Sequence, residues 1–462
     1  MQKSKPGIFF IGIGGIGMSS LARWFKAHGW LVTGSDLALS SLTGELTKEG
    51  IGIFRGHKAT NISESTGLVI QSQAIKADNP EVLRAKKLGI PLLTYPQAVG
   101  RITENYKTIA IAGAHGKSTT TALTGLVLMK AKFDPTIIVG TKLKELGGRN
   151  FRIGKSDFLV LEADEFGKAF LNYSPTYTII TNIDREHLDI YKTLANVKKT
   201  FLQFIARTKP GGTLVLNADN PELFSLKARI RKIATKRKLG VHWYSLSTAA
   251  AREAKAAMNI AGAHNLSNAL AAYTLGRILG IPKMKILSAI AGYQGAWRRM
   301  EYKGEFAVNH AKLKVSVYDD YAHHPTEIKA TLQAFREKYP SRTLVCVFQP
   351  HQAKRLEALY KEFQSAFEEA DVSLLLPLYK VPGRDEKYKL DSESLVKTMQ
   401  KKYPGRRIFY LADSKNLKNA LNTLLGDPAM CGPEMSGKKK GAVIVMMGAG
   451  DIAEHTKKIL TK

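Results

Sequence analysis

A lysine and a serine follow a pair of glycines in a spacing that suits phosphate chemistry. Gly116 is followed directly by Lys117 and Ser118, and the loop comes straight after an apolar run at 108–112 that predicts a buried strand. Backbone amides of such a loop can surround the β- and γ-phosphates of ATP, the lysine can neutralise their charge and the serine hydroxyl can bind Mg²⁺. Two residues, and not the usual four, separate the glycines, so the loop is a variant of the phosphate-binding pattern. The residues expected to contact ATP here are Gly113, Ala114, His115, Gly116, Lys117, Ser118 and Thr119.

A second glycine-rich loop, near the start of the chain, points to another phosphorylated ligand. Residues 12–17 read Gly-Ile-Gly-Gly-Ile-Gly directly after the apolar run 8–11, and Asp36 follows 19 residues after Gly17. Glycines at this spacing let a diphosphate approach a helix N-terminus, and the acid can bind a ribose hydroxyl. The pattern suits NAD as well as a UDP-sugar, so a dehydrogenase stays open at this point. A chain with both loops binds two phosphorylated ligands, which favours a transferase or a ligase.

Acids and histidines that follow predicted strands are candidates for metal binding. Glu162 ends the predicted strand 158–161, and ligands bind at the carboxyl ends of strands in α/β sheets. Mg²⁺ prefers one or two carboxylates together with phosphate oxygens, although a solvated acidic turn explains the spacing equally well. His187 closes a polar run after the predicted strand 177–180, and a lone histidine is more often structural than a ligand.

A third polar cluster, Asp319 to Pro325, includes the pair His323-His324 and follows the predicted strand 314–318. Pro325 suits the first turn of a helix, which we expect over residues 325–338. Paired histidines can bind zinc, but a third ligand at a suitable spacing is missing. Contact with a nucleotide or a substrate is therefore the favoured role.

Composition limits the class of protein. The chain has 462 residues, of which 44% are hydrophobic and 23% charged, as in globular proteins and unlike disordered or fibrous ones. Lys and Arg number 69 against 39 Asp and Glu, which gives a net charge of +30. This excess is compatible with nucleic acid, with an anionic surface or with anionic small substrates. No RNA-binding signature accompanies it, so we expect no specific nucleic-acid partner.

Cysteine usage and hydropathy point to an intracellular protein. Cys346 and Cys431 lie too far apart in the sequence for a CxxC motif, so neither a metal cluster nor a disulfide framework is expected, and a reducing cytoplasm is the predicted location. The apolar run 7–22 holds five glycines between residues 7 and 17, which favours a strand entering a turn over a signal peptide. No stretch of 18 or more apolar residues predicts a membrane span. We expect a monomer or a homodimer.

Apolar runs alternate with amphipathic stretches along the whole chain. The runs that lead into glycine, such as 443–447, fit buried parallel strands, and helical spacing recurs over 325–338 and 355–369. Alternating strands and helices predict α/β domains. We predict three domains, over residues 1–104, 105–303 and 304–462.

Together, these motifs resemble the Mur ligase family. The resemblance covers nearly the whole chain in the family's order and implies an N-terminal Rossmann-like domain for a UDP-sugar, a central P-loop ATPase-like domain and a C-terminal Rossmann-like domain for an amino acid. The matching segments, besides the two glycine loops and Gly34-Ser35-Asp36, are Glu162 to Glu165, Thr181-Asn182-Ile183, His264 to Ala272, Arg298 to Glu301, Asp319 to Glu327, Phe348 to His351 and Gly448 to Ile452.

The resemblance also implies a reaction with ATP and Mg²⁺ as cofactors. ATP would phosphorylate the lactyl carboxylate of UDP-N-acetylmuramate, and the amine of L-alanine would attack the acyl phosphate to give an amide, ADP and phosphate. Phosphorylation gives a poor electrophile a leaving group, so the protein must mainly position the partners and stabilise charge. A related ligase that adds a murein peptide or another amino acid to the same UDP-sugar is the alternative, because Gln352 stands where the family usually has arginine.

The family's residue roles carry over to matching positions of this chain. Lys117, Glu162 and His187 would be catalytic, with Ser118 and Glu162 on one Mg²⁺ and His187 on a second. Lys198 and Lys199 do not fall cleanly at the carbamylated lysine of several relatives, so neither is assigned. The remaining expected contacts are Asn265 and Asn268 with adenine; Arg299 (or Arg298) and Asp320 with ATP phosphate or ribose; Gly12, Gly14, Gly15, Gly17, Asp36 and Ser72 with the UDP-sugar; and His323, His351 and Arg355 at the amino-acid end, where an arginine can match a free carboxylate.

Overall fold

The computed structural model of the chain describes residues 6–308, 315–379, 388–426 and 441–461. The chain divides into two compact units. The first unit extends to Glu186 and also includes Leu194–Met258 and Ser267–Gln294. The second unit comprises His187–Thr193, Asn259–Leu266 and the chain from Gly295 onward. Two sheets lie in the first unit and one in the second, and each sheet has its own helices, which confirms the predicted three α/β domains.

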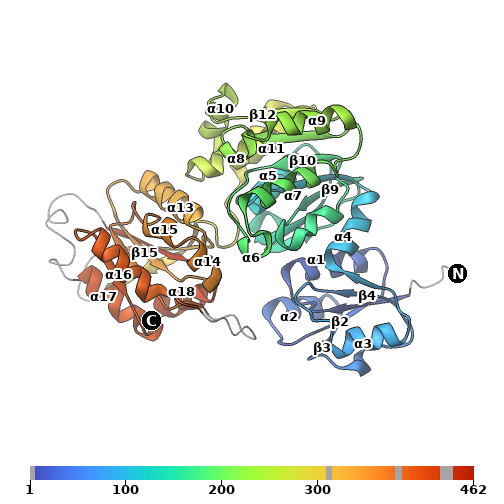
Figure 1. The fold of residues 1–462 in the computed structure, drawn as a ribbon, viewed down its shortest axis with the longest axis horizontal. Coiled ribbons are helices and arrows are strands. Elements are labelled where there is room, and N and C mark those ends of the chain that lie inside the picture. The colour runs from blue at the N-terminus through green and yellow to red at the C-terminus, as the bar shows by residue number, and fades with distance from the viewer. Residues whose placement is uncertain (1–5, 309–314, 380–387, 427–440, 462) are drawn as a thin grey trace. The chain divides into compact units, whose positions relative to one another are not determined.

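The first sheet consists of five parallel strands in the order β3-β2-β1-β4-β5 (Figure 1). Phe9, Phe10 and Ile11 of β1 are buried, as expected for a central strand covered on both faces. Because the strand order reverses between β1 and β4, the loops after these two strands form the place where such sheets bind ligands. The elements are β1 (Gly7–Ile11), α1 (Ile16–Ala27), β2 (Val32–Asp36), α2 (Ser41–Lys48), β3 (Gly52–Arg55), β4 (Thr66–Gln71), α3 (Pro80–Lys87), β5 (Leu92–Thr94) and α4 (Tyr95–Glu104).

The second sheet has seven strands in the order β12-β11-β10-β6-β9-β7-β8, all parallel except the pair β7–β8. Its strand β6 lies between β9 and β10, so the segments that follow these three strands meet at one edge. The strands are β6 (Lys107–Ala112), β7 (Thr136–Leu143), β8 (Arg149–Arg152), β9 (Phe158–Glu162), β10 (Tyr177–Ile180), β11 (Thr213–Asn217) and β12 (Gly240–Tyr244). The helices in this part of the chain, of which α6 and the start of α11 belong to the second unit, are α5 (Lys117–Lys130), η3 (Phe166–Asn172), α6 (Leu188–Tyr191), α7 (Leu194–Ile205), α8 (Pro221–Phe224), α9 (Lys227–Arg237), α10 (Ala249–Ala257), α11 (Ala263–Ile278) and α12 (Lys283–Gly292).

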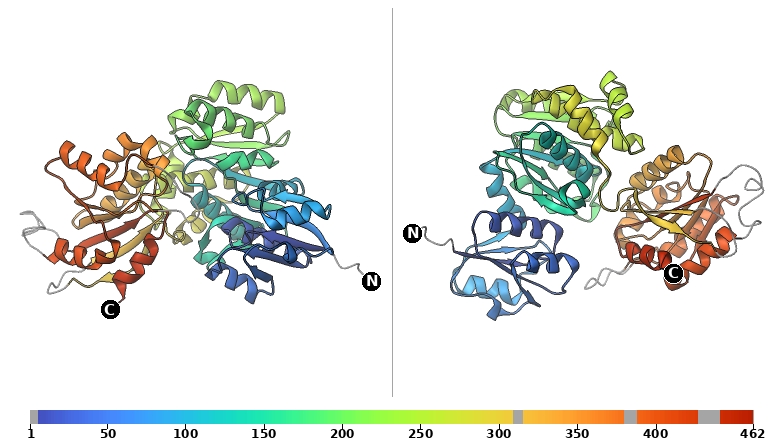
Figure 2. Two further views of the ribbon diagram at one scale, coloured as in Figure 1. Left: turned by 60° about the horizontal axis from the view of Figure 1, so that its bottom comes forward. Right: turned by 180° about the vertical axis from the view of Figure 1, so that it is seen from behind.

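The third sheet has six strands in the order β13-β14-β18-β15-β16-β17, and only β13 runs antiparallel to its neighbour. Figure 2 shows this sheet and its helices from two further directions. The elements are β13 (Glu301–Phe306), β14 (Val315–Asp320), α13 (Pro325–Lys338), β15 (Thr343–Phe348), α14 (Ala353–Ala358), α15 (Tyr360–Gln364), β16 (Val372–Leu375), α16 (Ser392–Lys402), β17 (Arg407–Tyr410), α17 (Leu417–Gly426), β18 (Ala442–Met447) and α18 (Ile452–Leu460).

Most of the expected elements are present, and one expected helix is wrong. The helix predicted over 325–338 is α13 with the same bounds, whereas the one predicted over 355–369 is divided into α14 and α15. The break lies at Leu359, whose φ of −118° and ψ of 25° are not helical. Leu356, Leu359 and Phe363 are nevertheless all buried, so the apolar spacing that predicted one helix is satisfied by two short ones. The predicted domain boundaries stay predictions; the one after residue 303 falls inside β13.

Cys346 is a buried free thiol on β15, and Cys431 lies outside the described residues. Among the helices of the described segments, none combines the length and the apolar character that crossing a membrane requires.

Candidate active site

Glycine at two positions lets the loop after β6 pack closely against its neighbours. Gly113 has a φ of 147° and Gly116 a φ of 80°, which side-chain-bearing residues rarely adopt. A Cβ atom at Gly113 would overlap with Thr181 Oγ1, and one at Gly116 would overlap with Asn268 Oδ1. The loop then enters α5, so the N-terminal amides of this helix face the space where phosphate is expected.

The segment after β10 holds the phosphate-binding loop in shape. Asn182 accepts a hydrogen bond from the backbone N–H of His115 at 2.8 Å and donates one to the His115 carbonyl at 2.9 Å. Thr181 Oγ1 donates to the same carbonyl at 2.6 Å, and the His115 ring lies 2.9 Å from Asp184. The sequence motif Thr-Asn-Ile therefore acts as a support for the loop.

Lys117 lies in a buried ion pair that the sequence did not indicate. Its Nζ is 2.9 Å from Glu165 Oε2 and donates to the Gly113 carbonyl at 2.8 Å. The Glu165 side chain is 2% exposed, so this carboxylate has little access to water. Burial lowers the pKa of Lys117, but the carboxylates of Glu165 and Asp164 together raise it by more than burial lowers it. The net shift of the pKa is therefore upward, and the ammonium stays charged.

Ser118 and Glu162 come together as expected for a metal site. Ser118 Oγ donates to Glu162 Oε1 at 3.1 Å, and Glu162 Oε2 accepts from the backbone N–H of Gly140 at 2.7 Å. A Cβ atom at Gly140 would lie 2.7 Å from Glu162 Oε1, so glycine keeps room for this carboxylate. Burial raises the pKa of Glu162 while Lys117 opposes the shift. A carboxylate and a hydroxyl beside a phosphate-binding loop match the oxygen ligands that Mg²⁺ prefers.

The structure also brings together the residues predicted around the first glycine loop. Asp36 Oδ2 accepts a hydrogen bond from the backbone N–H of Gly14 at 2.8 Å, so the acid lies directly against the loop. Ser72, after β4, donates its backbone N–H to the Ile11 carbonyl at 3.0 Å, and its Cβ lies 3.1 Å from the position of a Cβ at Gly12. Gly15 is the N-cap of α1. The predicted set Gly12, Gly14, Gly15, Gly17, Asp36 and Ser72 thus surrounds the start of α1 at the point where the strand order reverses.

A buried polar network lies beneath this loop. Glu81 is fully buried and accepts from Ser35 Oγ at 2.7 Å and from Asn61 Nδ2 at 2.7 Å, and it lies 2.8 Å from His57 Nδ1. Ser35 immediately precedes Asp36. The network therefore fixes the end of β2 from which Asp36 projects.

Replacing Glu81 with leucine is expected to destabilise the protein by about 3 kcal/mol, because Ser35, His57 and Asn61 would face an apolar group without their shared acceptor. The measurement is the midpoint of the first urea-unfolding transition. Glu64→Leu is the matched control, because the Glu64 side chain is 82% exposed and its ion pair with Arg84 spans 3.7 Å. Equal midpoints for the two variants would contradict the role of Glu81 as a stabilising buried acceptor.

Helix α1, which starts at the first glycine loop, packs directly against the second sheet. Asn150 of β8 is fully buried and donates through Nδ2 to Ser20 Oγ and to the Ile16 carbonyl, both at 2.6 Å. Arg23 donates to Asn150 Oδ1 at 2.9 Å, and Lys142 pairs with Glu45 at 2.8 Å. The two glycine loops thus belong to one packed unit.

Tyr95 lies against the first glycine loop, and no sequence motif pointed to it. A Cβ atom at Gly17 would lie 2.8 Å from the Tyr95 hydroxyl oxygen, so the phenol rests against the first turn of α1. Burial raises the pKa of Tyr95, with further contributions from the charges of Glu162 and Asp164. The hydroxyl therefore lies within electrostatic reach of both the first loop and the acid expected to bind metal.

In the second unit, Arg298 and Arg299 have different environments. Arg298 is 5% exposed and donates to the carbonyls of Gly448 and Gly450, which makes it a structural residue. Arg299 lies 3.6 Å from Glu327. Burial, with a further contribution from the charge of Arg299, lowers the pKa of His264 to about 4, so that imidazole is neutral at pH 7. The phosphate contact expected for Arg299 (or Arg298) stays a prediction.

Asp320 organises the segment around Arg299. Its Oδ2 accepts from the backbone N–H of Met300 at 2.8 Å and its Oδ1 from that of Ala322 at 2.9 Å. His323 follows, with Nδ1 2.9 Å from the Tyr321 carbonyl and 3.2 Å from Glu327. The ATP contact expected for Asp320 stays a prediction, and its observed role is to hold the backbone of its neighbours.

His351 and Arg355 lie after β15, at the same carboxyl edge of the third sheet as His323 after β14. The His351 ring stacks on Tyr379 at 5.5 Å, and Arg355 Nη1 donates to the His351 carbonyl at 3.5 Å. Gln352 has a φ of 68° and is the N-cap of α14. The expected amino-acid end is thus gathered at one sheet edge.

The other predicted residues are placed as follows. Asn268 of α11 lies against Gly116 in the first unit. Asn265, on the same helix but in the second unit, donates to the Ala261 carbonyl at 2.8 Å. His187 is also assigned to the second unit, as the N-cap of α6 with a φ of 53°. The metal role of His187 and the adenine role of both asparagines stay predictions.

Comparison with known proteins gives three family matches along the chain. The Mur ligase family catalytic domain matches residues 7–107, the Mur ligase middle domain residues 111–276, and the Mur ligase glutamate ligase domain residues 298–450.

Individual relatives match over nearly their full length. The UDP-N-acetylmuramate–L-alanine ligase of Desulfosudis oleivorans is 37% identical, over 96% of this chain and 96% of that protein. The enzyme of the same name from Desulfatibacillum aliphaticivorans is 34% identical, over 98% and 97%. A crystal structure of UDP-N-acetylmuramate–alanine ligase from Thermotoga maritima has a TM-score of 0.73 and 26% identity, over 99% and 98%. A murein peptide ligase from Psychrobacter arcticus shares the fold, with a TM-score of 0.66 and 20% identity over 99% and 98%. The chain therefore belongs to the Mur ligase family of ATP-dependent ligases.

Proposed function

We propose that this protein joins L-alanine to the lactyl carboxylate of UDP-N-acetylmuramate in an ATP-dependent reaction that passes through an acyl phosphate. The observation that carries the proposal is the pair of phosphate-binding loops in one packed unit, one followed by Lys117 and Ser118 and the other capped by Asp36. A dehydrogenase has no use for the loop that carries Lys117 and Ser118. The named relatives at 34–37% identity support the choice of substrates.

ATP would lie with its phosphates over the loop 113–116 and the N-terminus of α5. Lys117 would leave Glu165 and hold the γ-phosphate, where it stabilises the charge of the transferring phosphoryl group. Ser118 and Glu162 are the residues fit to hold Mg²⁺, which when bound neutralises phosphate charge. Asn268, in contact with Gly116, is placed to meet the nucleotide.

UDP-N-acetylmuramate would place its diphosphate at the start of α1, among the glycines of the first loop and near Asp36 and Ser72. Its lactyl carboxylate must then reach the loop that carries Lys117. Tyr95, which lies against Gly17 and within reach of the charge of Glu162, is positioned along this route. The amino acid would bind through His323, His351 and Arg355 of the second unit, with the arginine facing its carboxylate.

The Tyr95→Phe variant is expected to raise the KM for UDP-N-acetylmuramate about fivefold and to leave the KM for ATP unchanged, because it removes one hydrogen-bonding group beside the sugar substrate. Steady-state kinetics with each substrate varied in turn measures this. Tyr106→Phe serves as control, since the Tyr106 hydroxyl accepts a hydrogen bond from Trp24 at 3.4 Å. Equal effects on both KM values would assign Tyr95 a structural role instead.

Addition of a murein peptide or another amino acid is the alternative function, and Gln352 is the observation that favours it. The deciding experiment measures phosphate release from ATP with UDP-N-acetylmuramate and a panel of L-alanine, glycine, L-serine and a murein tripeptide. We expect release to depend on L-alanine, with the highest kcat/KM in the panel. Release that requires the tripeptide would establish the alternative, and no release with any acceptor would reject both.

A further inference from the structure

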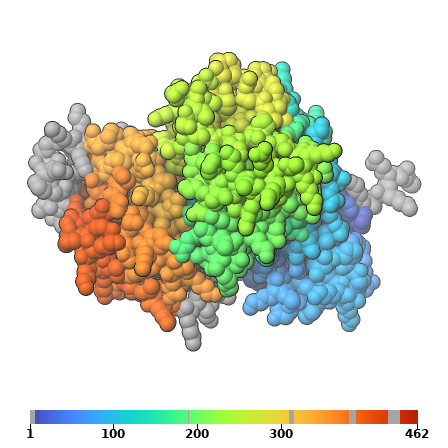
Figure 3. Space-filling model, turned by 45° about the horizontal axis from the view of Figure 1, so that its top comes forward, coloured from blue at the N-terminus to red at the C-terminus, as the bar shows by residue number. Residues whose placement is uncertain are grey.

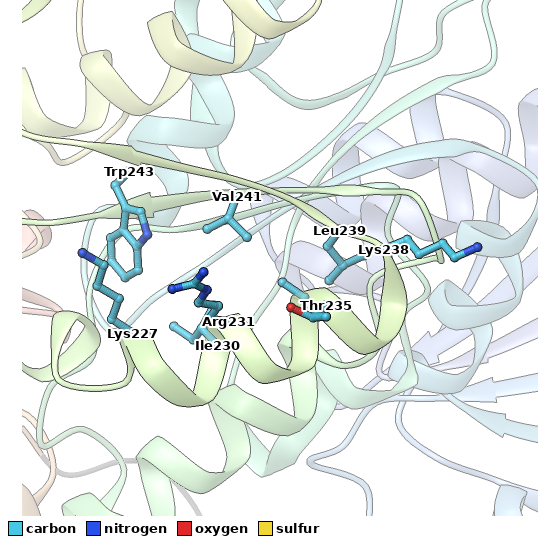
Figure 4. A pocket seen from close by; sticks show the side chains of 9 residues that line it. Lys227, Ile230, Arg231, Thr235, Lys238, Leu239, Val241 and Trp243 are labelled. Atoms are coloured by element: carbon cyan, nitrogen blue, oxygen red, sulfur yellow. The ribbon is translucent and has the colours of Figure 1, made fainter.

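A surface groove lies between helix α9 and strand β12, away from the candidate active site. Its volume is about 500 Å³, and its floor is formed by apolar side chains (Figure 4). Strand β12 is the outer strand of the second sheet and is separated from β6 by β11 and β10, so the groove is not part of the phosphate-binding edge. In the space-filling view the green surface of this region faces the viewer (Figure 3). The residues that line the groove are Lys227, Ile230, Arg231, Ala234, Thr235, Lys238, Leu239, Val241 and Trp243.

Among the described residues that line the groove, three are lysine or arginine and none is acidic. Helix α9 contains six lysines and arginines among its 11 residues and no acid, and Lys238 follows directly. Within the described segments, the structure places no ion-pair partner on Lys227, Arg231 or Lys238. Like charges on one helix repel each other, so an anionic occupant would relieve an unfavourable field that the described residues leave uncompensated.

Aromatic rings lie at one end of the same groove. Trp243 of β12 packs against Phe224 with ring centres 5.5 Å apart and an angle of 76° between the planes. Phe224 is 43% exposed, and Lys227 Nζ lies 5.1 Å from the centre of its ring. Figure 4 shows Trp243 and Lys227 at one end of the groove that both residues line, with Arg231 farther along it. Planar rings next to unpaired cations are the combination that binds nucleobases together with their phosphates.

We propose that this groove binds single-stranded nucleic acid without sequence preference. The phosphates would lie along Lys227, Arg231 and Lys238, and one base would stack on Trp243. Lys227 and Arg231 lie one turn apart on α9 and Lys238 follows its last residue, so the cations extend along the whole helix, about 15 Å at 1.5 Å per residue. This is a strip for several successive phosphates and not for a single one. An unpaired strand is favoured over a duplex because only an unstacked base can reach the tryptophan. The proposal also gives a role to part of the +30 net charge.

The test uses the full-length protein and a fluorescein-labelled 12-nucleotide oligouridylate, with binding followed by anisotropy between 50 and 300 mM salt. The variant Lys227→Gln/Arg231→Gln/Lys238→Gln is expected to bind at least tenfold more weakly at low salt. Its slope of log K against log salt should fall by about 2, since each phosphate contact on a single strand contributes about 0.7. The control Lys86→Gln/Lys87→Gln/Lys130→Gln loses the same charge from exposed positions of the same unit and should bind like the parent.

A second variant separates stacking from charge. Trp243→Leu is expected to weaken binding about tenfold without changing the salt slope, and Trp243→Phe should restore most of the affinity. ATP-dependent phosphate release should be unchanged in all these variants, which also reports that they are folded. An equal loss of binding in the control variant would overturn the proposal, as would UMP binding as tightly as the 12-mer. Binding of anionic vesicles without binding of the oligonucleotide would overturn it too.

Discussion

Replacing Lys117 with methionine is expected to lower the rate of ATP-dependent phosphate release about 10³-fold. The side chain of methionine is close to that of lysine in length but carries no charge, so the transferring phosphoryl group would lose the cation that we propose to hold it. Groups that stabilise charge in a transition state within a largely water-free site contribute effects of this size. Lys117 also begins α5, and the helix itself remains intact, because methionine is a good helix former.

Two companion variants make this result interpretable. Lys130→Met lies at the other end of the same helix, is exposed and should keep full activity. Lys117→Met leaves Glu165 buried without its cation, so the single variant is also expected to be less stable. The double variant Lys117→Met/Glu165→Gln removes both charges and should recover stability without recovering turnover. Substantial turnover in either Lys117 variant would show that the loop after β6 does not bind the reacting nucleotide.

The sequence indicated the parts of this site whose residues are adjacent in the chain. Short apolar runs before each glycine loop predicted β1 and β6. The phosphate-binding role of the loops could be predicted because glycine, lysine and serine directly after a strand have few other functions. Asp36 and Glu162 could be found because each ends a strand, and parallel strands bring such ends to one edge.

Residues that act through tertiary packing could not be found in this way. Glu165 was visible only as one of several acids after β9, and its pairing with Lys117 depends on how the turn into η3 folds. Tyr95 and Asn150 belong to no motif, and their roles come from the packing of the first sheet's helices against the second sheet. Arg298 and Arg299 are adjacent in the sequence, and only the structure shows that Arg298 is buried against backbone carbonyls while Arg299 lies beside Glu327.

Replacing Glu165 with leucine is expected to destabilise the ATP-free protein by about 3 kcal/mol. A buried ion pair that loses one partner leaves an uncompensated charge, and losses of this size are usual when that happens. Lys117 would keep its hydrogen bond to the Gly113 carbonyl at 2.8 Å, and Asp164 lies 3.8 Å away, so the charge is not left entirely alone. The shift in the urea-unfolding midpoint without nucleotide measures this effect.

The same variant should bind ATP more tightly, and this second effect distinguishes a functional ion pair from a purely structural one. In the parent protein, Lys117 must break its contact with Glu165 before it can hold a phosphate, and the cost of breaking the pair lowers the affinity. Without Glu165 the lysine already lacks its buried anion, so the γ-phosphate of ATP would supply the negative charge that the variant has lost. We expect an ATP dissociation constant about tenfold lower by calorimetry, and a larger ATP-induced rise in the unfolding midpoint than in the parent.

Asp164→Asn is the matched control for Glu165→Leu, because the Asp164 side chain is 54% exposed and lies 3.8 Å from Lys117. Its effect on stability and on ATP affinity should be small, since exposed charge pairs contribute little. Glu165→Gln keeps the size of the side chain and one hydrogen-bond acceptor, and it should fall between the parent and the leucine variant on both measurements. If Glu165→Leu lowers stability but leaves ATP affinity unchanged, the ion pair is structural and Lys117 keeps its position when nucleotide binds. If both quantities move as expected, Glu165 holds the lysine in the ATP-free enzyme and gives it up to the γ-phosphate.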